Sequence, residues 1–273
     1  MTLIAIIGDP IAHSLSPAMQ NAVFRKMNLP YLYLPIRVTP GELPSFIKRI
    51  KNDRSGITGF NVTIPHKEKV MKCLDWISPE ARAIGAVNTV IFKKGRLMGY
   101  NTDGRGYLRS LQEKTHFTPR RKRILILGAG GAARAILYAL KNAGAKKIYV
   151  SNRTLRRATK LTRDSIPLKA KELEKIFPSI DLLINATSIG LKGTRFKNLP
   201  LSLLSKRVIV SDLIYRPLMT PLLRDAKRRG FKIHPGLGML LYQGAESFRL
   251  WTGKKPDLAV MRKALLDALE RNQ

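Results

Sequence analysis

The sequence of 273 residues contains only one cysteine, Cys73. A single cysteine excludes a disulfide framework and most cysteine-based metal sites, so we predict no metal site. No apolar run reaches the ~20 residues that a membrane-spanning helix needs. The apolar start of the chain has no basic segment before it and ends at Gly8-Asp9-Pro10, which does not fit a signal peptide. We therefore predict a cytoplasmic protein without a membrane partner.

Acidic residues are also scarce: 18 Asp and Glu stand against 50 Lys and Arg, which gives a net charge of +32. Such a surplus raises the hypothesis of a nucleic-acid partner. However, the basic residues are spread along the whole chain, and aromatic residues make up only 7%. Nucleic-acid-binding surfaces usually concentrate their charge and interleave it with aromatic side chains. We therefore expect a generally basic surface that favours anionic small molecules, without a specific nucleic-acid partner.

The first hundred residues predict an α/β domain. Ser16 and Ser78 each precede a proline and are expected to cap helices. The last two predicted strands are separated only by Lys94-Gly95, which predicts a hairpin in an otherwise mostly parallel, mixed sheet. The predicted strands are residues 3–7, 31–38, 59–64, 88–93 and 96–100, and the predicted helices are residues 18–27, 43–51, 67–74 and 79–85.

The second half of the chain predicts a βαβ unit. A continuous apolar strand at residues 123–127 runs into a glycine-rich turn, followed by a helix at 134–142 and a strand at 147–150. Residues 105–111 are expected to be helical, and the polar, basic residues 112–123 to connect two domains. Further strands are expected at 182–186 and 208–212, and two final helices at 240–250 and 257–271.

The glycine-rich turn, Gly128-x-Gly130-x-x-Ala133, follows a strand and opens a helix, as dinucleotide-binding motifs do. Its first glycine allows the tight turn, its second lets the backbone approach a pyrophosphate, and Ala133 allows close helix packing. The N–H groups at the helix start would then face the phosphates.

The end of the next strand indicates which dinucleotide is bound. NAD enzymes place Asp or Glu there, and NADP enzymes place Arg nearby. This chain has Asn152-Arg153-Thr154, with Arg156 and Arg157 beyond and no acidic residue. Guanidinium groups bind a 2′-phosphate in a bidentate manner, so NADP is favoured over NAD. Residues 106–239 are therefore predicted to be a Rossmann-type NADP-binding domain. Residues 1–105 with the C-terminal helices in 240–273 would form a substrate-binding domain, with a cleft between the two domains.

Polar residues fall where predicted strands give way to loops or helices. The stretch Asn61-Val62-Thr63-Ile64-Pro65-His66-Lys67 ends a β-branched strand at a proline. Asn88 and Asp103 lie at two further junctions. Ser14 and Ser16 surround a helix start and could bind a carboxylate, although capping alone explains either serine equally well. A lone lysine or aspartate is usually a surface or turn residue, but their joint placement predicts a ligand site.

Several motifs closely resemble the shikimate dehydrogenase family, in the order of that family and over essentially the whole chain. The lysine motif at 61–67 and Asn101-Thr102-Asp103-Gly104 are the specific ones, because many dehydrogenases share the glycine loop. One minor departure is Leu213, which stands where methionine is often found. The resembling stretches are 8–11, 14–17, 61–67, 84–89, 99–104, 128–133, 152–154, 185–190 and 236–240.

The resemblance implies reversible NADPH-dependent reduction of 3-dehydroshikimate to shikimate, a step toward chorismate and the aromatic amino acids. Lys67 would be the acid/base, acting with Asp103. Ser14 and Ser16 would hold the substrate carboxylate. The implied contacts to the rest of the substrate are Thr63, Lys67, Asn88, Asp103, Tyr215 and Gln243. The implied cofactor contacts are Gly128, Ala129, Gly130, Gly131 and Ala132 at the phosphates, Asn152, Arg153, Thr154, Arg156 and Arg157 at the 2′-phosphate, and Thr187, Leu213 and Gly236 near the nicotinamide.

Three other functions share some of these sequence features. A quinate/shikimate dehydrogenase that takes NAD would be expected to carry an acid in place of Asn152-Arg153-Thr154. A two-domain dehydrogenase acting on a folate fits the paired serines less well than one acting on a small hydroxylated acid. A nucleic-acid-binding or regulatory protein on this scaffold would not need both Lys67 and Asp103. The sequence does not fix the oligomeric state, and a homodimer stays one option.

Overall fold

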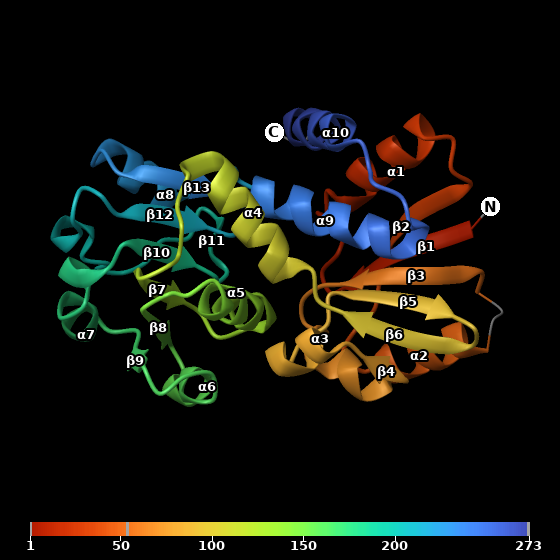
Figure 1. Cartoon of the computed structure of the whole chain (residues 1–273), viewed down its shortest axis with the longest axis horizontal. Coiled ribbons are helices and arrows are strands. Elements are labelled where there is room, and N and C mark those ends of the chain that lie inside the picture. The colour runs from red at the N-terminus through yellow and green to blue at the C-terminus, as the bar shows by residue number, and fades with distance from the viewer. Residues whose placement is uncertain (1, 53–54, 272–273) are drawn as a thin grey trace. The chain divides into compact units, whose positions relative to one another are not determined.

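A computed structural model describes residues 2–52 and 55–271 (Figure 1). The chain divides into two compact units, Met1–Gly106 with Leu241–Gln273, and Tyr107–Leu240. It passes from the first unit to the second within helix α4 (Asp103–Thr115) and returns within helix α9 (Leu237–Thr252). Each unit contains one six-stranded sheet with helices, which confirms a two-domain α/β fold. None of the helices in the described parts of the chain is long and apolar enough to cross a membrane.

The sheet of the first unit is mixed, with the order β2-β1-β3-β5-β6-β4. Strand β5 runs antiparallel to β3 and β6, while the other neighbours are parallel. Lys94 and Gly95 both adopt positive φ, 51° and 70°, as a two-residue hairpin turn requires, so the predicted hairpin is confirmed. The strands are β1 (Thr2–Gly8), β2 (Tyr31–Arg37), β3 (Ile57–Val62), β4 (Trp76–Ile77), β5 (Thr89–Lys93) and β6 (Arg96–Tyr100).

The helices of this unit test the predicted caps. Ser78 accepts a hydrogen bond from Ala81 N, so its cap is confirmed. The predicted cap at Ser16 is wrong. Leu15 occupies the N-cap position with backbone angles that are already helical, so Ser16 is the first residue of the helix. The helix predicted at 67–74 forms only in part, as the short 3-10 helix η1 (Lys69–Cys73). It ends there because Leu74 becomes extended and feeds the chain into β4. The elements are α1 (Ser16–Lys26), α2 (Leu43–Lys51), η1 (Lys69–Cys73), α3 (Pro79–Ile84) and α10 (Leu258–Glu270).

Helix α2 shows how the first unit builds its core. Its buried residues, Leu43, Phe46, Ile47 and Ile50, have the spacing of one helical face, and they belong to a cluster with Phe60 of β3. Each such side chain contributes roughly 1.5–3 kcal/mol when it is fully buried. This packing holds β3 in place, and the chain leaving β3 carries Thr63 and Lys67.

The sheet of the second unit is parallel throughout, with the order β13-β12-β10-β7-β8-β9. If these six strands are renumbered 1 to 6 along the chain from β7, the order across the sheet is 6-5-4-1-2-3, which is the Rossmann order. The direction of strand succession reverses between β7 and β10, the place where such folds bind ligands. The strands are β7 (Arg123–Leu127), β8 (Lys147–Asn152), β9 (Ser165–Pro167), β10 (Leu182–Asn185), β12 (Ile209–Asp212) and β13 (Lys232–Pro235). The remaining elements are α5 (Gly131–Asn142), α6 (Leu155–Thr159), α7 (Ala170–Glu174), η2 (Phe177–Ser179), β11 (Ile189–Lys192), η3 (Leu201–Leu203) and α8 (Pro221–Arg228).

The expected connection at 112–123 is wrong in its first part, because α4 continues to Thr115. Tyr107 and Leu111 are fully buried in the core beside β7, and the Thr115 hydroxyl donates to Leu111 O over 2.6 Å. The polarity of residues 112–114 therefore marks an exposed helix face rather than a linker.

Candidate active site

Lys67 and Asp103 form a largely buried ion pair in the first unit. Lys67 lies in the loop after β3, and Asp103 is the first residue of α4. The Lys67 Nζ atom is 2.5 Å from Asp103 Oδ2, and the two side chains are 15% and 4% exposed. Asn101 Oδ1 accepts the Asp103 N–H over 3.1 Å, which fixes the helix start. The N-terminus of α4 also favours a negative side chain. The pair is thus a charge-assisted contact between two side chains that are largely shielded from solvent.

Asn88, just before β5, fixes the other carboxylate oxygen. Its Nδ2 donates to Asp103 Oδ1 over 2.8 Å. Its Oδ1 accepts from Thr102 N and from the Thr89 hydroxyl, both over 2.9 Å. Because the amide oxygen already faces these two donors, the NH₂ group must face Asp103. Gln243 on α9 is also buried, with its Oε1 3.4 Å from Asn88 Nδ2.

Asn61 belongs to the layer beneath this site. It is buried, its Oδ1 accepts from the Tyr33 hydroxyl over 2.7 Å, and its Nδ2 lies 3.0 Å from both Asn88 O and Ser247 Oγ. Sequence reasoning singled out Asn61 but missed Tyr33 and Ser247. No local signal identifies them, because Tyr33 and Ser247 lie 28 and 186 positions from Asn61 in the sequence.

His66 also has a structural role. It is fully buried, and its Nε2 donates to Val38 O over 2.6 Å, which ties the loop after β3 to the chain after β2. Half-buried Thr63 is held by its N–H, which donates to Ile7 O over 2.9 Å. A Cβ at Gly8 would collide with the Thr63 methyl group, so this close approach of two loops requires glycine.

Ser14 and Ser16 lie together at the start of α1. The Ser14 hydroxyl accepts the Ser16 N–H over 3.3 Å, and Ser16 is buried. The Ser16 side chain makes no capping bond, which contradicts the explanation of that serine as a cap. Tyr215, in contrast, lies in the second unit, in the loop after β12.

The glycine turn of the second unit fits a dinucleotide. Gly128 has φ of 115°, and a Cβ there would lie 2.7 Å from Ala186 O. A Cβ at Gly130 would meet nothing within 4 Å, so open space faces the N-cap of α5. Ala133 is buried against the sheet. Free space beside the first N–H groups of a helix is where a pyrophosphate binds.

The end of β8 presents basic side chains to solvent. Asn152 ends the strand, and its Nδ2 donates to Thr154 O over 2.9 Å, which shapes the turn into α6. Arg153, Thr154, Arg156 and Arg157 are all exposed. A 2′-phosphate could reach these guanidinium groups without displacing a core side chain.

Two loops follow β10 and β12. Thr187 lies in the first and is half-buried, and Leu213 begins the second. A Cβ at Gly236 would collide with Leu213 O, so the chain after β13 passes close to Leu213. Asp212, at the end of β12, is fully buried, and this burial raises its pKa to about 6.

Burial also lowers the pKa of a histidine in this unit, His234. His234 lies between the hydroxyls of Ser110 and Ser211, 2.8 and 2.9 Å from its ring nitrogens. Burial lowers the pKa of His234 to about 4, so the ring is neutral. The cluster joins α4 to β12 and β13 and is structural.

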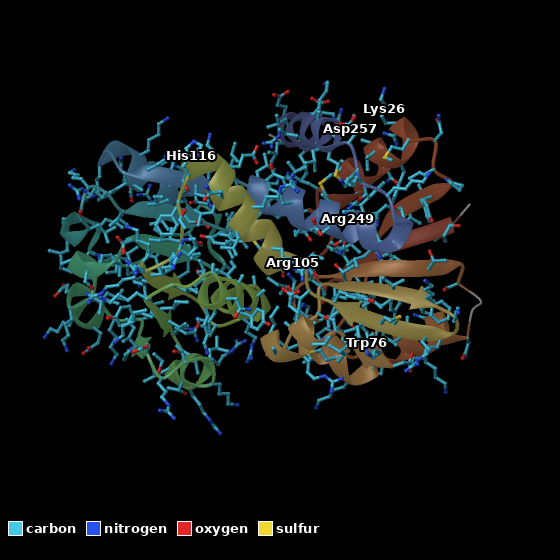
Figure 2. All side chains as sticks on the ribbon, in the orientation of Figure 1. Lys26, Trp76, Arg105, His116, Arg249 and Asp257 are labelled. Atoms are coloured by element: carbon cyan, nitrogen blue, oxygen red, sulfur yellow. The ribbon has the colours of Figure 1, made fainter. Side chains whose placement is uncertain are left out.

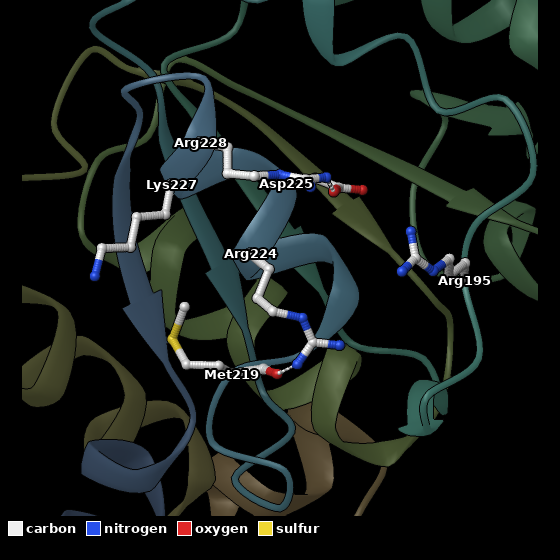
Figure 3. A pocket seen from close by; sticks show the side chains of 6 residues that line it. All are labelled: Arg195, Met219, Arg224, Asp225, Lys227 and Arg228. Atoms are coloured by element: carbon white, nitrogen blue, oxygen red, sulfur yellow. Dashed lines mark hydrogen bonds and ion pairs between the residues drawn. The ribbon is translucent and has the colours of Figure 1, made fainter.

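Positive charge is concentrated in the second unit, which holds 29 Lys and Arg against 7 Asp and Glu; the first unit holds 21 against 11. The first unit also has exposed basic side chains, and Figure 2 labels two of them, Arg105 and Arg249. One concave surface of the second unit, beside α8, is also basic (Figure 3). There Arg224 donates to Met219 O, and Arg228 pairs with Asp225. None of the predicted site residues lines it.

Comparison with known proteins agrees with this geometry. The chain is 44% identical to the "Shikimate dehydrogenase (NADP(+))" of Geobacillus kaustophilus, with 97% of this chain and 98% of that protein covered. The chain belongs to the shikimate dehydrogenase family. Family models described as "Shikimate dehydrogenase substrate binding domain", "Shikimate / quinate 5-dehydrogenase" and "Shikimate 5'-dehydrogenase C-terminal domain" match residues 6–90, 110–198 and 236–266.

Solved structures of this family have the same fold. Shikimate 5-dehydrogenase from Thermus thermophilus, in complex with NADP(H) and shikimate, is 41% identical with a TM-score of 0.88; the match covers 98% of this chain and 100% of that one. Quinate dehydrogenase from Corynebacterium glutamicum, in complex with NAD, is 29% identical with a TM-score of 0.87, over 97% and 99% of the two chains. These two similar proteins are thus named for shikimate and for quinate, and their structures contain NADP(H) and NAD respectively.

Proposed function

We propose that this chain catalyses the reversible NADPH-dependent reduction of 3-dehydroshikimate to shikimate, a step toward chorismate and the aromatic amino acids. The observation that carries the proposal is the buried Lys67–Asp103 pair, held by Asn88, in a chain of the shikimate dehydrogenase family. The fit of the glycine turn and of the basic end of β8 to NADP supports it.

Lys67 is the proton donor in this proposal. When bound, NADPH supplies the hydride that reduces the C3 ketone. The ketone oxygen gains negative charge during reduction, and the Lys67 ammonium stabilises this charge and donates a proton to the oxygen. In the reverse direction, Lys67 Nζ accepts the proton of the C3 hydroxyl. Asp103 accepts from Nζ over 2.5 Å and holds it in one position.

The first unit would bind the substrate. Ser14 and Ser16 would hold its carboxylate, a role supported by their placement side by side at the start of α1, where the Ser16 hydroxyl is not used as a helix cap. Thr63, Asn88 and Gln243 would contact its hydroxyl groups, together with Lys67 and Asp103. Tyr215 is the one proposed substrate contact from the second unit.

The second unit would bind NADP. Gly128, Ala129, Gly130, Gly131 and Ala132 would hold the diphosphate. Asn152, Arg153, Thr154, Arg156 and Arg157 would surround the 2′-phosphate. Thr187, Leu213 and Gly236 would border the nicotinamide.

A second candidate, quinate oxidation with NAD, is favoured by the similarity to quinate dehydrogenase. It is disfavoured by the absence of Asp or Glu from residues 151–163, at and beyond the end of β8. Steady-state assays with shikimate or quinate, each with NADP⁺ or NAD⁺, separate the two. We expect the highest kcat/KM for shikimate with NADP⁺. A preference for quinate or for NAD⁺ would contradict the proposal.

A cytoplasmic location is also proposed, supported by the lack of a disulfide framework in a chain with one cysteine. Assembly as a homodimer and the lack of a specific nucleic-acid partner stay predictions.

A further inference from the structure

The carboxylate of Asp212 lies at the base of two loops of the second unit and is not among the proposed substrate or cofactor contacts. It is the last residue of β12 and has no exposed surface. Its Oδ2 accepts from the Thr220 hydroxyl over 2.7 Å. Its Oδ1 accepts from Asn185 Nδ2 and from Ile214 N, each over 3.0 Å. Three donors thus converge on one buried carboxylate.

Through Asn185, Asp212 reaches the loop that follows β10. Asn185 Nδ2 also donates to Ile189 O over 2.8 Å, across the loop. Asn185 Oδ1 accepts from the N–H and the hydroxyl of Thr187, over 3.0 and 2.7 Å. The Thr187 hydroxyl in turn accepts the Ile189 N–H over 3.0 Å. The position of Thr187 is therefore set by Asn185, whose amide is oriented by Asp212.

The same carboxylate reaches the loop between β12 and α8. Its bond to Ile214 N turns the chain directly after Leu213, while Leu213 N donates to Asn185 O over 3.0 Å. Thr220, at the far end of this loop, caps α8 by accepting from Leu223 N. Asp212 therefore ties both ends of the 213–220 loop together and links it to the Thr187 loop.

We propose that Asp212 is a positioning residue for the nicotinamide half of NADP(H), acting through Asn185, Ile214 and Thr220 on the loops that carry Thr187 and Leu213. The inference rests on the proposed function, because it takes these loops as the border of the nicotinamide. The adenosine half lies at different elements, the glycine turn and the end of β8. Loss of the Asp212 contacts should therefore weaken one half of the cofactor site and spare the other.

The variant Asp212→Asn keeps the size of the side chain but leaves one acceptor oxygen for three donors. Calorimetric titration of the full chain with NADP⁺ should show binding about tenfold weaker than in the wild type, whereas adenosine 2′,5′-bisphosphate, which lacks the nicotinamide, should bind within about twofold. Thr220→Val removes one donor and should give a smaller change in the same direction. His234→Gln alters a buried polar residue on the neighbouring strand and should change neither affinity.

Equal weakening of both ligands by Asp212→Asn would show a general structural role and overturn the proposal, as would unchanged affinity for both. If Asp212→Asn does not fold, Thr220→Val decides by the same comparison. A wild-type protein that fails to bind NADP⁺ would instead contradict the proposed function, so the two failures are distinguishable.

Discussion

Asn88 donates a hydrogen bond of 2.8 Å to Asp103 Oδ1, the carboxylate whose other oxygen holds Lys67 Nζ. The amide can donate there because its own oxygen is engaged by Thr102 N and the Thr89 hydroxyl. Asp103 therefore positions the ammonium group directly, and Asn88 holds Asp103 in turn through a buried hydrogen bond.

The first prediction concerns Asn88→Asp. The change places a second carboxylate against Asp103 and removes a donor, so we expect the free energy of unfolding at neutral pH to fall by about 3 kcal/mol. Urea unfolding measures this change, and the loss should shrink at low pH, where a carboxyl group is protonated. Asn198→Asp adds the same charge at an exposed position and should stay within about 0.5 kcal/mol of the wild type. Equal effects of the two changes would contradict the described hydrogen bonds.

The second prediction concerns the 2′-phosphate. Arg153→Ala and Arg157→Ala should each lower kcat/KM for NADPH about tenfold and leave the value for NADH within about twofold, because NADH lacks this phosphate. Arg207→Ala removes the same charge at another exposed position of the second unit and serves as the control. If Arg207→Ala has the same effect as the other two, general basicity explains cofactor attraction.

The third prediction separates two glycines of one turn. Gly128→Ala should destabilise the protein by a few kcal/mol, because φ is positive and the new Cβ would approach Ala186 O. Gly130→Ala should leave stability within about 1 kcal/mol but weaken NADP⁺ binding, because its methyl group enters the space proposed for the diphosphate. Thermal unfolding and calorimetric titration test the pair. A stable Gly128→Ala, or unchanged binding by Gly130→Ala, would count against this description of the turn.

The sequence predicted most of the features that local chemistry determines. The glycine turn, the hairpin at Lys94-Gly95 and the cap at Ser78 each depend on neighbouring residues and are confirmed. The family and its two-domain α/β fold are confirmed as well. The Lys67–Asp103 ion pair is present, although the role of each residue stays a proposal.

The features that escaped prediction depend on tertiary contacts. Ser16 is not a cap because Leu15 already adopts helical angles. The turn after Lys67 stays a short 3-10 helix because the chain must enter β4. Ser247 and Asp212 carry no motif of their own, and only the folded chain brings them to Asn61 and Asn185.

The fourth prediction concerns pH. The raised pKa of Asp212 adds stability at low pH that is lost as the pH rises toward about 6. The lowered pKa of His234 adds stability at neutral pH that is lost as the pH falls toward about 4. Each contribution is at most about 3 kcal/mol, and the two oppose each other between about pH 4 and 6.

Asp212→Asn should therefore make stability fall more steeply than in the wild type as the pH is lowered through this range, and His234→Gln should make it fall less steeply. Urea unfolding across the range measures both slopes. Slopes equal to that of the wild type would show that neither group titrates as described.

The most direct test of the account is the kinetics of Lys67→Ala with shikimate and NADP⁺. If Lys67 is the acid/base held by Asp103, kcat should fall by at least about a hundredfold, with a much smaller change in KM and with wild-type affinity for NADP⁺. A kcat near that of the wild type, or a loss carried mainly by KM, would contradict the central claim.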